Sequence, residues 1–168
     1  MKAGNVRNIL KIGLVLVLFA VLSAGAGYLL WAGGGYPTGE QTMYHLYRAD
    51  ALYTNVAEGK WCSLYDPYWY NGTMLWRYQA PLSAVVLALC RWAAGGSCLL
   101  SYYYYIGFLL FLNLTVFLIL GIRRKREILA CVLGFVWCFM PYNLRLVFVE
   151  GKLDRALALV FYRYFSAF

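Results

Sequence analysis

Three apolar runs along the chain are long enough to form membrane-spanning helices, and they cover residues 9–33, 99–122 and 128–144. At 1.5 Å of rise per helical residue the first run reaches roughly 36 Å, whereas the hydrocarbon core of a bilayer is about 30 Å thick. The pattern therefore predicts an all-α integral membrane protein with about three full transmembrane helices in a single membrane domain, residues 1–168.

Two further apolar segments are too short to cross a bilayer alone. Residues 81–94 number about fourteen and include Arg91, which would cost roughly 2.5–3.5 kcal/mol at the bilayer centre. This segment is predicted to be an interfacial helix. Residues 156–168 carry Arg163 in their middle and are expected to be the beginning of a fourth span that is cut off.

The composition agrees with a membrane protein. Hydrophobic residues make up 63% of the chain and charged residues 13%, against roughly 45–50% and 25% in soluble domains. Aromatic residues reach 19%, and the rings of tyrosine and tryptophan favour the headgroup region of a bilayer. Membrane lipids are therefore expected partners. The five cysteines show no CxxC pair and no metal-binding spacing, so they leave the compartment undecided.

The net charge of +8 is concentrated beside the predicted spans. One basic group lies within residues 2–11, before the first span, and another at residues 123–126, after the second. This distribution follows the positive-inside rule and argues against nucleic-acid binding. It predicts a multi-pass cell-membrane protein with a cytoplasmic N-terminus, a first outer loop at residues 34–98 and a second at 145–155.

The first outer loop contains two candidate catalytic side chains. Thr38 and Gln41 have the spacing of a capping box, so a helix is predicted to begin here and to run to about Glu58. Glu40 would lie in its first turn, where the helix dipole stabilises a carboxylate, and His45 follows five residues later. The alternative is that Glu40 only complements the dipole and that His45 only anchors the helix at the interface.

The second outer loop adds Asp154, which is predicted to face the first loop across the outer surface. Carboxylates from two loops could hold a divalent metal ion (Mg²⁺ or Mn²⁺) between Glu40 and Asp154, or position a hydroxyl acceptor. The alternative is a solvated connector with balanced charges.

An aromatic stretch at residues 61–72 is bounded by the turn dipeptides Asp66-Pro67 and Asn71-Gly72. Such a surface suits stacking on sugar rings, and it equally suits lying on lipid headgroups.

The order of these features resembles a known family. The first outer loop reads Gly39-Glu40, His45-Leu46, Arg48, Gly59-Lys60-Trp61, Asp66-Pro67-Tyr68, Asn71-Gly72 and Tyr78-Gln79-Ala80-Pro81-Leu82, and the second reads Pro141-Tyr142, Gly151 and Asp154–Ala156. These motifs resemble the 6-pyruvoyl-tetrahydropterin-synthase-related bacterial membrane proteins, which are similar to GT-C glycosyltransferases. The resemblance covers about residues 1–165 and corresponds to the N-terminal part of such a protein.

What the resemblance implies is transfer of a sugar from a polyprenyl-phosphate donor on the outer face. Glu40 would take the position of the first-loop catalytic acid, with His45 close to it, and Asp154 that of the second-loop acid. The leaving phosphate would need a cation, for which Arg145 and Arg155 are candidates. The chain departs from the family in having Glu40 for the usual aspartate, and it is expected to be a fragment that is inactive alone.

Two other functions stay open. The chain could be a non-catalytic subunit or scaffold whose aromatic outer loop binds lipid, glycan or a partner membrane helix. A transporter or channel is disfavoured, because no acidic residue lies inside a predicted span and Asn113 is nearly the only polar side chain in the second span.

Overall fold

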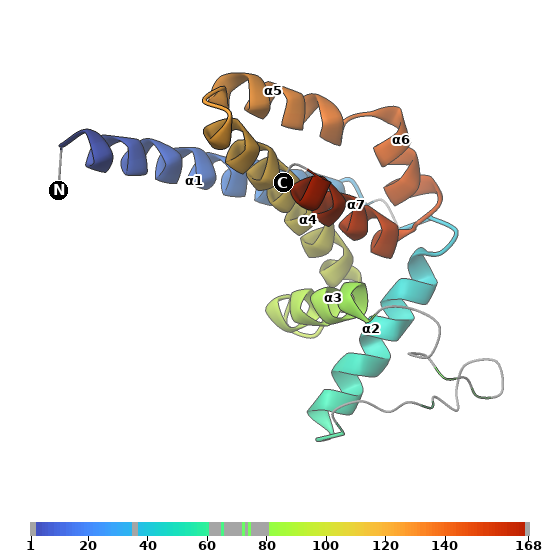
Figure 1. Cartoon of the computed structure of the whole chain (residues 1–168). Helices are drawn as coiled ribbons and strands as arrows, with labels where there is room; N and C mark the ends of the chain where they lie inside the picture. The colour runs from blue at the N-terminus through green and yellow to red at the C-terminus, as the bar shows by residue number, and fades with distance from the viewer. Residues whose placement is uncertain are drawn as a thin grey trace.

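The computed structural model describes residues 3–34, 37–60, 65, 72, 74 and 81–166, and all regular structure within them is helical. In chain order the elements are α1 (Ala3–Ala32), α2 (Thr42–Ala57), α3 (Leu82–Ala93), α4 (Cys98–Arg123), α5 (Glu127–Cys138), α6 (Pro141–Leu144), the π-helix η1 (Arg145–Val149) and α7 (Leu153–Ser166) (Figure 1).

Two of these helical segments, Leu10–Ala32 and Cys98–Arg123, are long and apolar enough to cross a membrane. A bent pair, Glu127–Cys138 with Pro141–Val149, makes a third if it counts as one span. The predicted all-α membrane fold is confirmed.

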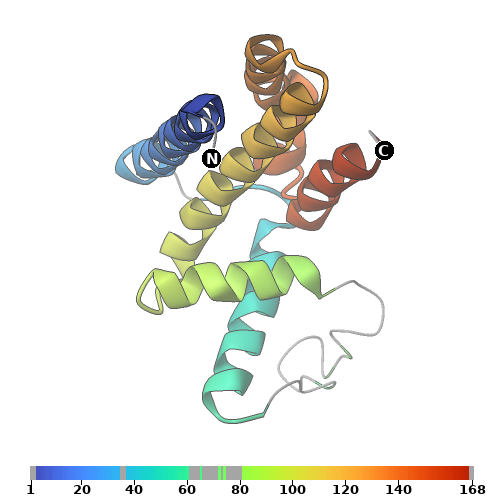
Figure 2. The same cartoon turned by 60° about the vertical axis from the view of Figure 1, so that its left-hand side comes forward.

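Helix α4 is the centre of the molecule, and α1, α3, α5 and α7 all pack against it (Figures 1 and 2). Its contact with α1 depends on glycine. A Cβ on Gly27 would lie 3.0 Å from the carbonyl oxygen of Tyr103, and a Cβ on Gly107 would lie 3.0 Å from that of Ser23. Small residues let membrane helices approach this closely. Because position 23 faces 107 and position 27 faces 103, α1 and α4 run antiparallel.

The third span is broken where the sequence predicts one helix over residues 128–144. Helix α5 ends at Cys138, Met140 is extended (φ −58°, ψ 135°), and a new helical segment begins at Pro141 with a bend of 48°. Proline disfavours helical geometry in the residue before it and suits the first position of a helix, so Pro141 starts a helix here. The helical path then continues through η1 to Val149, which shortens the predicted second outer loop of 145–155.

The first outer loop contributes helices α2 and α3. Figure 2 shows α3 lying across both α2 and α4. Arg91 of α3 forms an ion pair with Asp50 of α2, lies 4.4 Å from the ring centroid of Tyr53, and donates a hydrogen bond to the Gly96 carbonyl (2.8 Å). Arg91, whose charge disfavours a membrane crossing by this segment, therefore connects α3 to α2.

The predicted capping box at the start of α2 is wrong. The helix begins at Thr42, four residues after Thr38, and its N-cap, Gln41, makes no side-chain capping bond. The reason is a long-range contact that the sequence does not reveal. The Glu40 and Gln41 N–H groups donate to the carbonyl oxygens of Val149 (3.1 Å) and Glu150 (3.0 Å). Glu40 consequently lies before the helix and not in its first turn.

Helix α7 follows α4 instead of leading away from it. The Tyr105 hydroxyl of α4 donates to the Leu153 carbonyl at the start of α7 (2.9 Å), and Arg163 near its end donates to the Asn113 Oδ1 of α4 (3.0 Å). Leu153, Leu157 and Val160 are buried along the contact. The segment expected to begin a fourth span is thus a helix packed along α4.

Candidate functional site

The two outer segments of the chain meet at a pair of glycines. A Cβ on Gly39 would lie 2.8 Å from the Gly151 Cα, and one on Gly151 would lie 2.6 Å from the Thr42 backbone nitrogen. Gly151 also has a positive φ of 65°, which favours glycine. With the backbone hydrogen bonds from Glu40 and Gln41, this close approach fixes the beginning of α2 against the turn that leads into α7.

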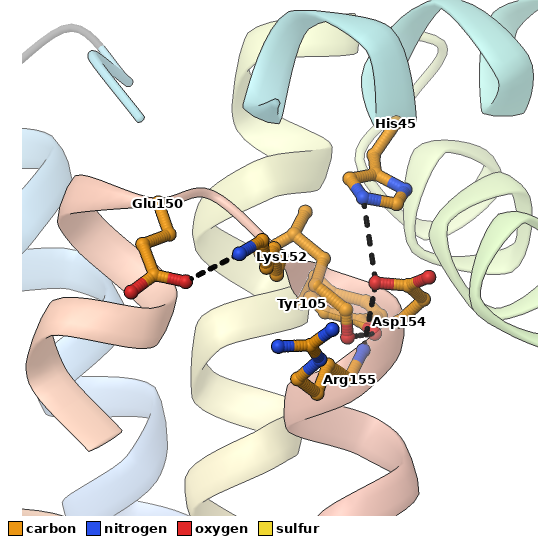
Figure 3. Close-up of polar contacts among 7 residues, drawn as sticks. His45, Tyr105, Glu150, Lys152, Asp154 and Arg155 are labelled. Atoms are coloured by element: carbon orange, nitrogen blue, oxygen red, sulfur yellow. Dashed lines mark hydrogen bonds and ion pairs between the residues drawn. The ribbon is translucent and has the colours of Figure 1, made fainter. Parts of the chain in front are cut away.

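This junction places His45 beside Asp154, as Figure 3 shows. His45 Nε2 lies 3.6 Å from Asp154 Oδ1, which is an electrostatic contact slightly longer than a hydrogen bond. The imidazole is buried, with 2% of its side chain exposed, whereas 42% of the Asp154 side chain is exposed. Asp154 is therefore the member of the pair that a substrate can reach.

The buried face of α2 is unusually polar at this point. Thr42, His45 and Arg48 are spaced three residues apart, so they follow one face of the helix, and all three are buried. Thr42 Oγ1 and His45 Nε2 have no hydrogen-bond partner among the described residues. Buried polar groups normally have partners, so such a cluster is typical of a functional site or of ordered water.

Burial lowers the pKa of His45, because desolvation disfavours the imidazolium. The Asp154 carboxylate raises that pKa in part, and the Arg48 guanidinium lowers it. The net direction is downward, so His45 is a neutral imidazole at neutral pH.

Charged side chains surround the entry to α7. Glu150 accepts a hydrogen bond from Lys152 Nζ (2.7 Å) and lies 3.2 Å from Arg145 Nε. The hydrogen bond from Lys152 lowers the pKa of Glu150. Asp154 Oδ1 in turn accepts from the Arg155 backbone N–H at 2.7 Å, which orients the carboxylate at the first turn of α7 (Figure 3).

Of the three predicted catalytic residues, the structure therefore brings His45 and Asp154 into contact. Glu40 is exposed, and its backbone N–H donates to the Val149 carbonyl, so its segment is joined to the one that leads into α7. Within the described ranges no group of three or more His, Cys, Asp or Glu side chains could hold a metal ion. The Glu40–Asp154 metal site thus stays a prediction, and the chemistry below uses only side chains of the chain.

Sequence reasoning missed Thr42 and Arg48 as members of the site. Their spacing with His45 is a usable signal, since a polar residue at every third position predicts a polar helix face. Only the structure shows that this face is buried. The predicted aromatic surface lies mostly outside the described residues, at 61–64 and 66–71.

One comparison with known proteins gives a match. A family model described as 6-pyruvoyl-tetrahydropterin synthase related domain, membrane protein, matches residues 76–167. This range holds α3 to α7 and Asp154, and it excludes Glu40 and His45. No curated protein and no solved structure matches the chain. Because the matched range covers more than half of the chain, the protein belongs to the 6-pyruvoyl-tetrahydropterin-synthase-related family of membrane proteins.

Proposed function

We propose that the chain carries part of the active site of a GT-C-like membrane glycosyltransferase, which uses a polyprenyl-phosphate-linked sugar as donor on the outer face of the membrane. The observation that supports this proposal best is the pairing of His45 with Asp154. A half-exposed carboxylate backed by a buried imidazole is suited to accepting a proton from a hydroxyl acceptor.

Asp154 is the group that touches the acceptor in this proposal, and His45 is a positioning residue. The neutral imidazole can direct an Nε2–H toward Asp154 Oδ1 and so hold one carboxylate oxygen. The 3.6 Å separation would shorten in a substrate complex, as catalytic hydrogen bonds commonly do. Glu40 is the second candidate base, because it is exposed on the adjoining segment.

The reaction is an inverting displacement at the sugar C1. The acceptor oxygen forms a bond to C1 while its proton passes to the carboxylate. The C1–O bond to the phosphate breaks, and polyprenyl phosphate leaves with the electron pair. Arg155 is the better cation for that phosphate, since it follows Asp154 directly, whereas Arg145 already pairs with Glu150.

The proposal is tested in native cell membranes, so that parts of the active site outside this chain are present. Polyprenyl phosphate glucose or polyprenyl phosphate mannose is supplied, and the released polyprenyl phosphate is measured. Asp154→Asn should reduce the rate by about 10²–10⁴-fold, the usual contribution of a general base. Glu40→Gln tests the second candidate in the same way.

The matched control is Glu58→Gln, which removes an exposed carboxylate at the far end of α2 that pairs with Lys60. It should leave the rate unchanged. Equal release by wild type, Asp154→Asn and Glu40→Gln would show that neither carboxylate is the base.

A second candidate function is a non-catalytic subunit that binds partner membrane helices. The observation in its favour is the exposed apolar surface of α5, where Ile128 is 84% exposed and Phe135 and Val136 exceed half. Lipid covers such a surface equally well. Absence of release from either donor, together with stable co-purification of a membrane partner, would favour this function.

A further inference from the structure

A cluster of cations lies between α4 and α5, at residues 123–126, which we call the basic turn. Every position in it is arginine or lysine, and every side chain in it is exposed. From the start of α4 to the end of α5, Glu127 is the one acidic residue. No ion pair of the described residues includes Arg124, Lys125 or Arg126. The basic turn therefore presents a local excess of positive charge.

The backbone holds these cations in a fixed conformation. The Lys125 N–H donates to the Ile122 carbonyl (3.2 Å), and the Arg126 N–H donates to the Gly121 carbonyl (2.9 Å). This pair of bonds is the Schellman pattern at the C-terminus of a helix.

Lys125 occupies the position of this motif that glycine usually takes. Its φ is 53°, and it is the only non-glycine residue with a positive φ in the described ranges. A side chain is disfavoured in this left-handed region, and residues held there often mark functional sites. The chain thus keeps a cation where the backbone alone favours glycine.

The basic turn borders on exposed apolar surface. Ile128, in the first turn of α5, is 84% exposed, and Val132, one turn further, is 54% exposed. Helix α5 packs mainly on α4, and of its described residues only Gly134 is buried. Cations beside an exposed apolar helix surface match an anionic lipid, in which a charged headgroup adjoins hydrocarbon chains.

Phosphate is an anion that suits these side chains, because guanidinium groups bind its oxygens in pairs and a lysine ammonium adds a point charge. A free phosphate or a nucleic acid would match the cations but leave the apolar surface of α5 without a partner. We propose that the basic turn binds the headgroup of an anionic phospholipid, in the leaflet at which α4 ends, with an acyl chain of that lipid along α5.

This lipid site is separate from the pair of His45 and Asp154. Figure 1 shows the basic turn at the end of α4 that is farther from α2, the helix that carries His45. The proposal therefore does not depend on the glycosyltransferase activity.

Binding is tested with the purified protein in a non-ionic detergent, by native mass spectrometry. The probes are dioleoyl phosphatidylglycerol and dioleoyl phosphatidylcholine, which share a phosphate and acyl chains and differ in net charge. The phosphatidylglycerol should bind about tenfold or more tightly, since each cation near an anionic headgroup contributes about fivefold. Glycerol phosphate, which has no acyl chains, should bind more weakly than the phosphatidylglycerol.

Replacing Arg124, Lys125 and Arg126 together by glutamine should abolish the preference for phosphatidylglycerol. Lys125→Gly separates binding from folding, because glycine suits the φ of 53° and removes one cation. Its unfolding temperature should not fall below that of the wild type, whereas its affinity for phosphatidylglycerol should fall about fivefold. Lys125→Arg should keep the preference. The matched control is Lys60→Gln, an exposed lysine after α2, which should bind as the wild type does.

Equal affinity of the wild type for the two lipids would overturn the proposal, and so would an unchanged preference in the triple variant. Binding of glycerol phosphate as tight as that of phosphatidylglycerol would overturn the lipid as partner and indicate a site for soluble phosphate. Asp154→Asn should keep the lipid preference, so the failure of this proposal and that of the glycosyltransferase proposal are distinguishable.

Discussion

His45 makes the stability of the outer site depend on pH, because its pKa differs between the folded and the unfolded chain. Its imidazole is buried beside Asp154 of α7, and its pKa lies below the ordinary value of 6.5 mainly because burial disfavours the charged ring. In the unfolded chain the same ring takes up a proton near pH 6.5. Its contribution to stability is therefore complete above pH 6.5 and is lost as the pH falls through the lowered pKa.

We expect the unfolding temperature of the wild type to fall between pH 7.5 and pH 5 by more than that of His45→Gln. The glutamine keeps a polar side chain at the position but takes up no proton. Fluorescence-monitored thermal unfolding in detergent, at matched ionic strength, measures both proteins. Parallel curves for the two proteins across this range would contradict the assignment of a lowered pKa.

At the scale of single residues, the sequence predicts which titratable side chains form the site better than it predicts their burial and their place in the helices. Asp154 was expected to face the first outer loop, and it does so through His45. The role of Arg48 as a buried charge next to them could not be predicted, because its burial depends on how the other helices, above all α3, pack against α2. Glu40 was placed in a helix that begins two residues later.

At the scale of helices, the length of each helix follows from the length of its apolar run in the sequence. The point at which a helix is interrupted depends on local backbone geometry. Helix α4 begins and ends within one residue of the predicted 99–122. The third run breaks at Met140, since the proline after it forces an extended conformation. Its continuation through η1 was not predicted, because η1 opens with Arg145, although the four residues that follow are apolar. π-Helical turns are frequent at functional sites.

The docking of α3 on α2 should depend on Arg91. Arg91→Met keeps an unbranched apolar stem but removes the ion pair with Asp50, the contact with the Tyr53 ring and the hydrogen bond to Gly96. We expect faster amide hydrogen exchange in α2 and a loss of about 1–3 kcal/mol, the cost of leaving a part-buried charge without its partner. Arg124→Met is the matched control, and equal exchange in both variants would exclude this role for Arg91.

For the whole molecule, the antiparallel packing of α1 and α4 has a consequence for topology. It brings the N-terminal end of α1 and the basic residues 123–126 to the same end of the molecule, as the distribution of charge predicts. The glycine contacts and the positions of the basic residues are independent observations. Both support an antiparallel arrangement of α1 and α4. Which end is cytoplasmic remains a prediction from charge.

Cysteine labelling in intact cells tests this topology. In a background with the five native cysteines replaced by serine, Lys60→Cys should react with a membrane-impermeant maleimide added outside, and Arg124→Cys should react only after permeabilisation. Both positions are exposed, so access through the protein does not limit labelling. Labelling of both positions from the same side would exclude the three-span topology.

The contact between Gly39 and Gly151 also determines when the outer site can form during synthesis of the chain. These residues are 112 positions apart, and at about 5–20 residues per second synthesis needs roughly 6–22 s to produce the second after the first. During this interval Thr42 and His45 lack their contacts with Gly151 and Asp154. The outer site therefore cannot assemble until residue 151 has been made, and slower synthesis lengthens the interval in which α2 depends on water, lipid headgroups or a chaperone.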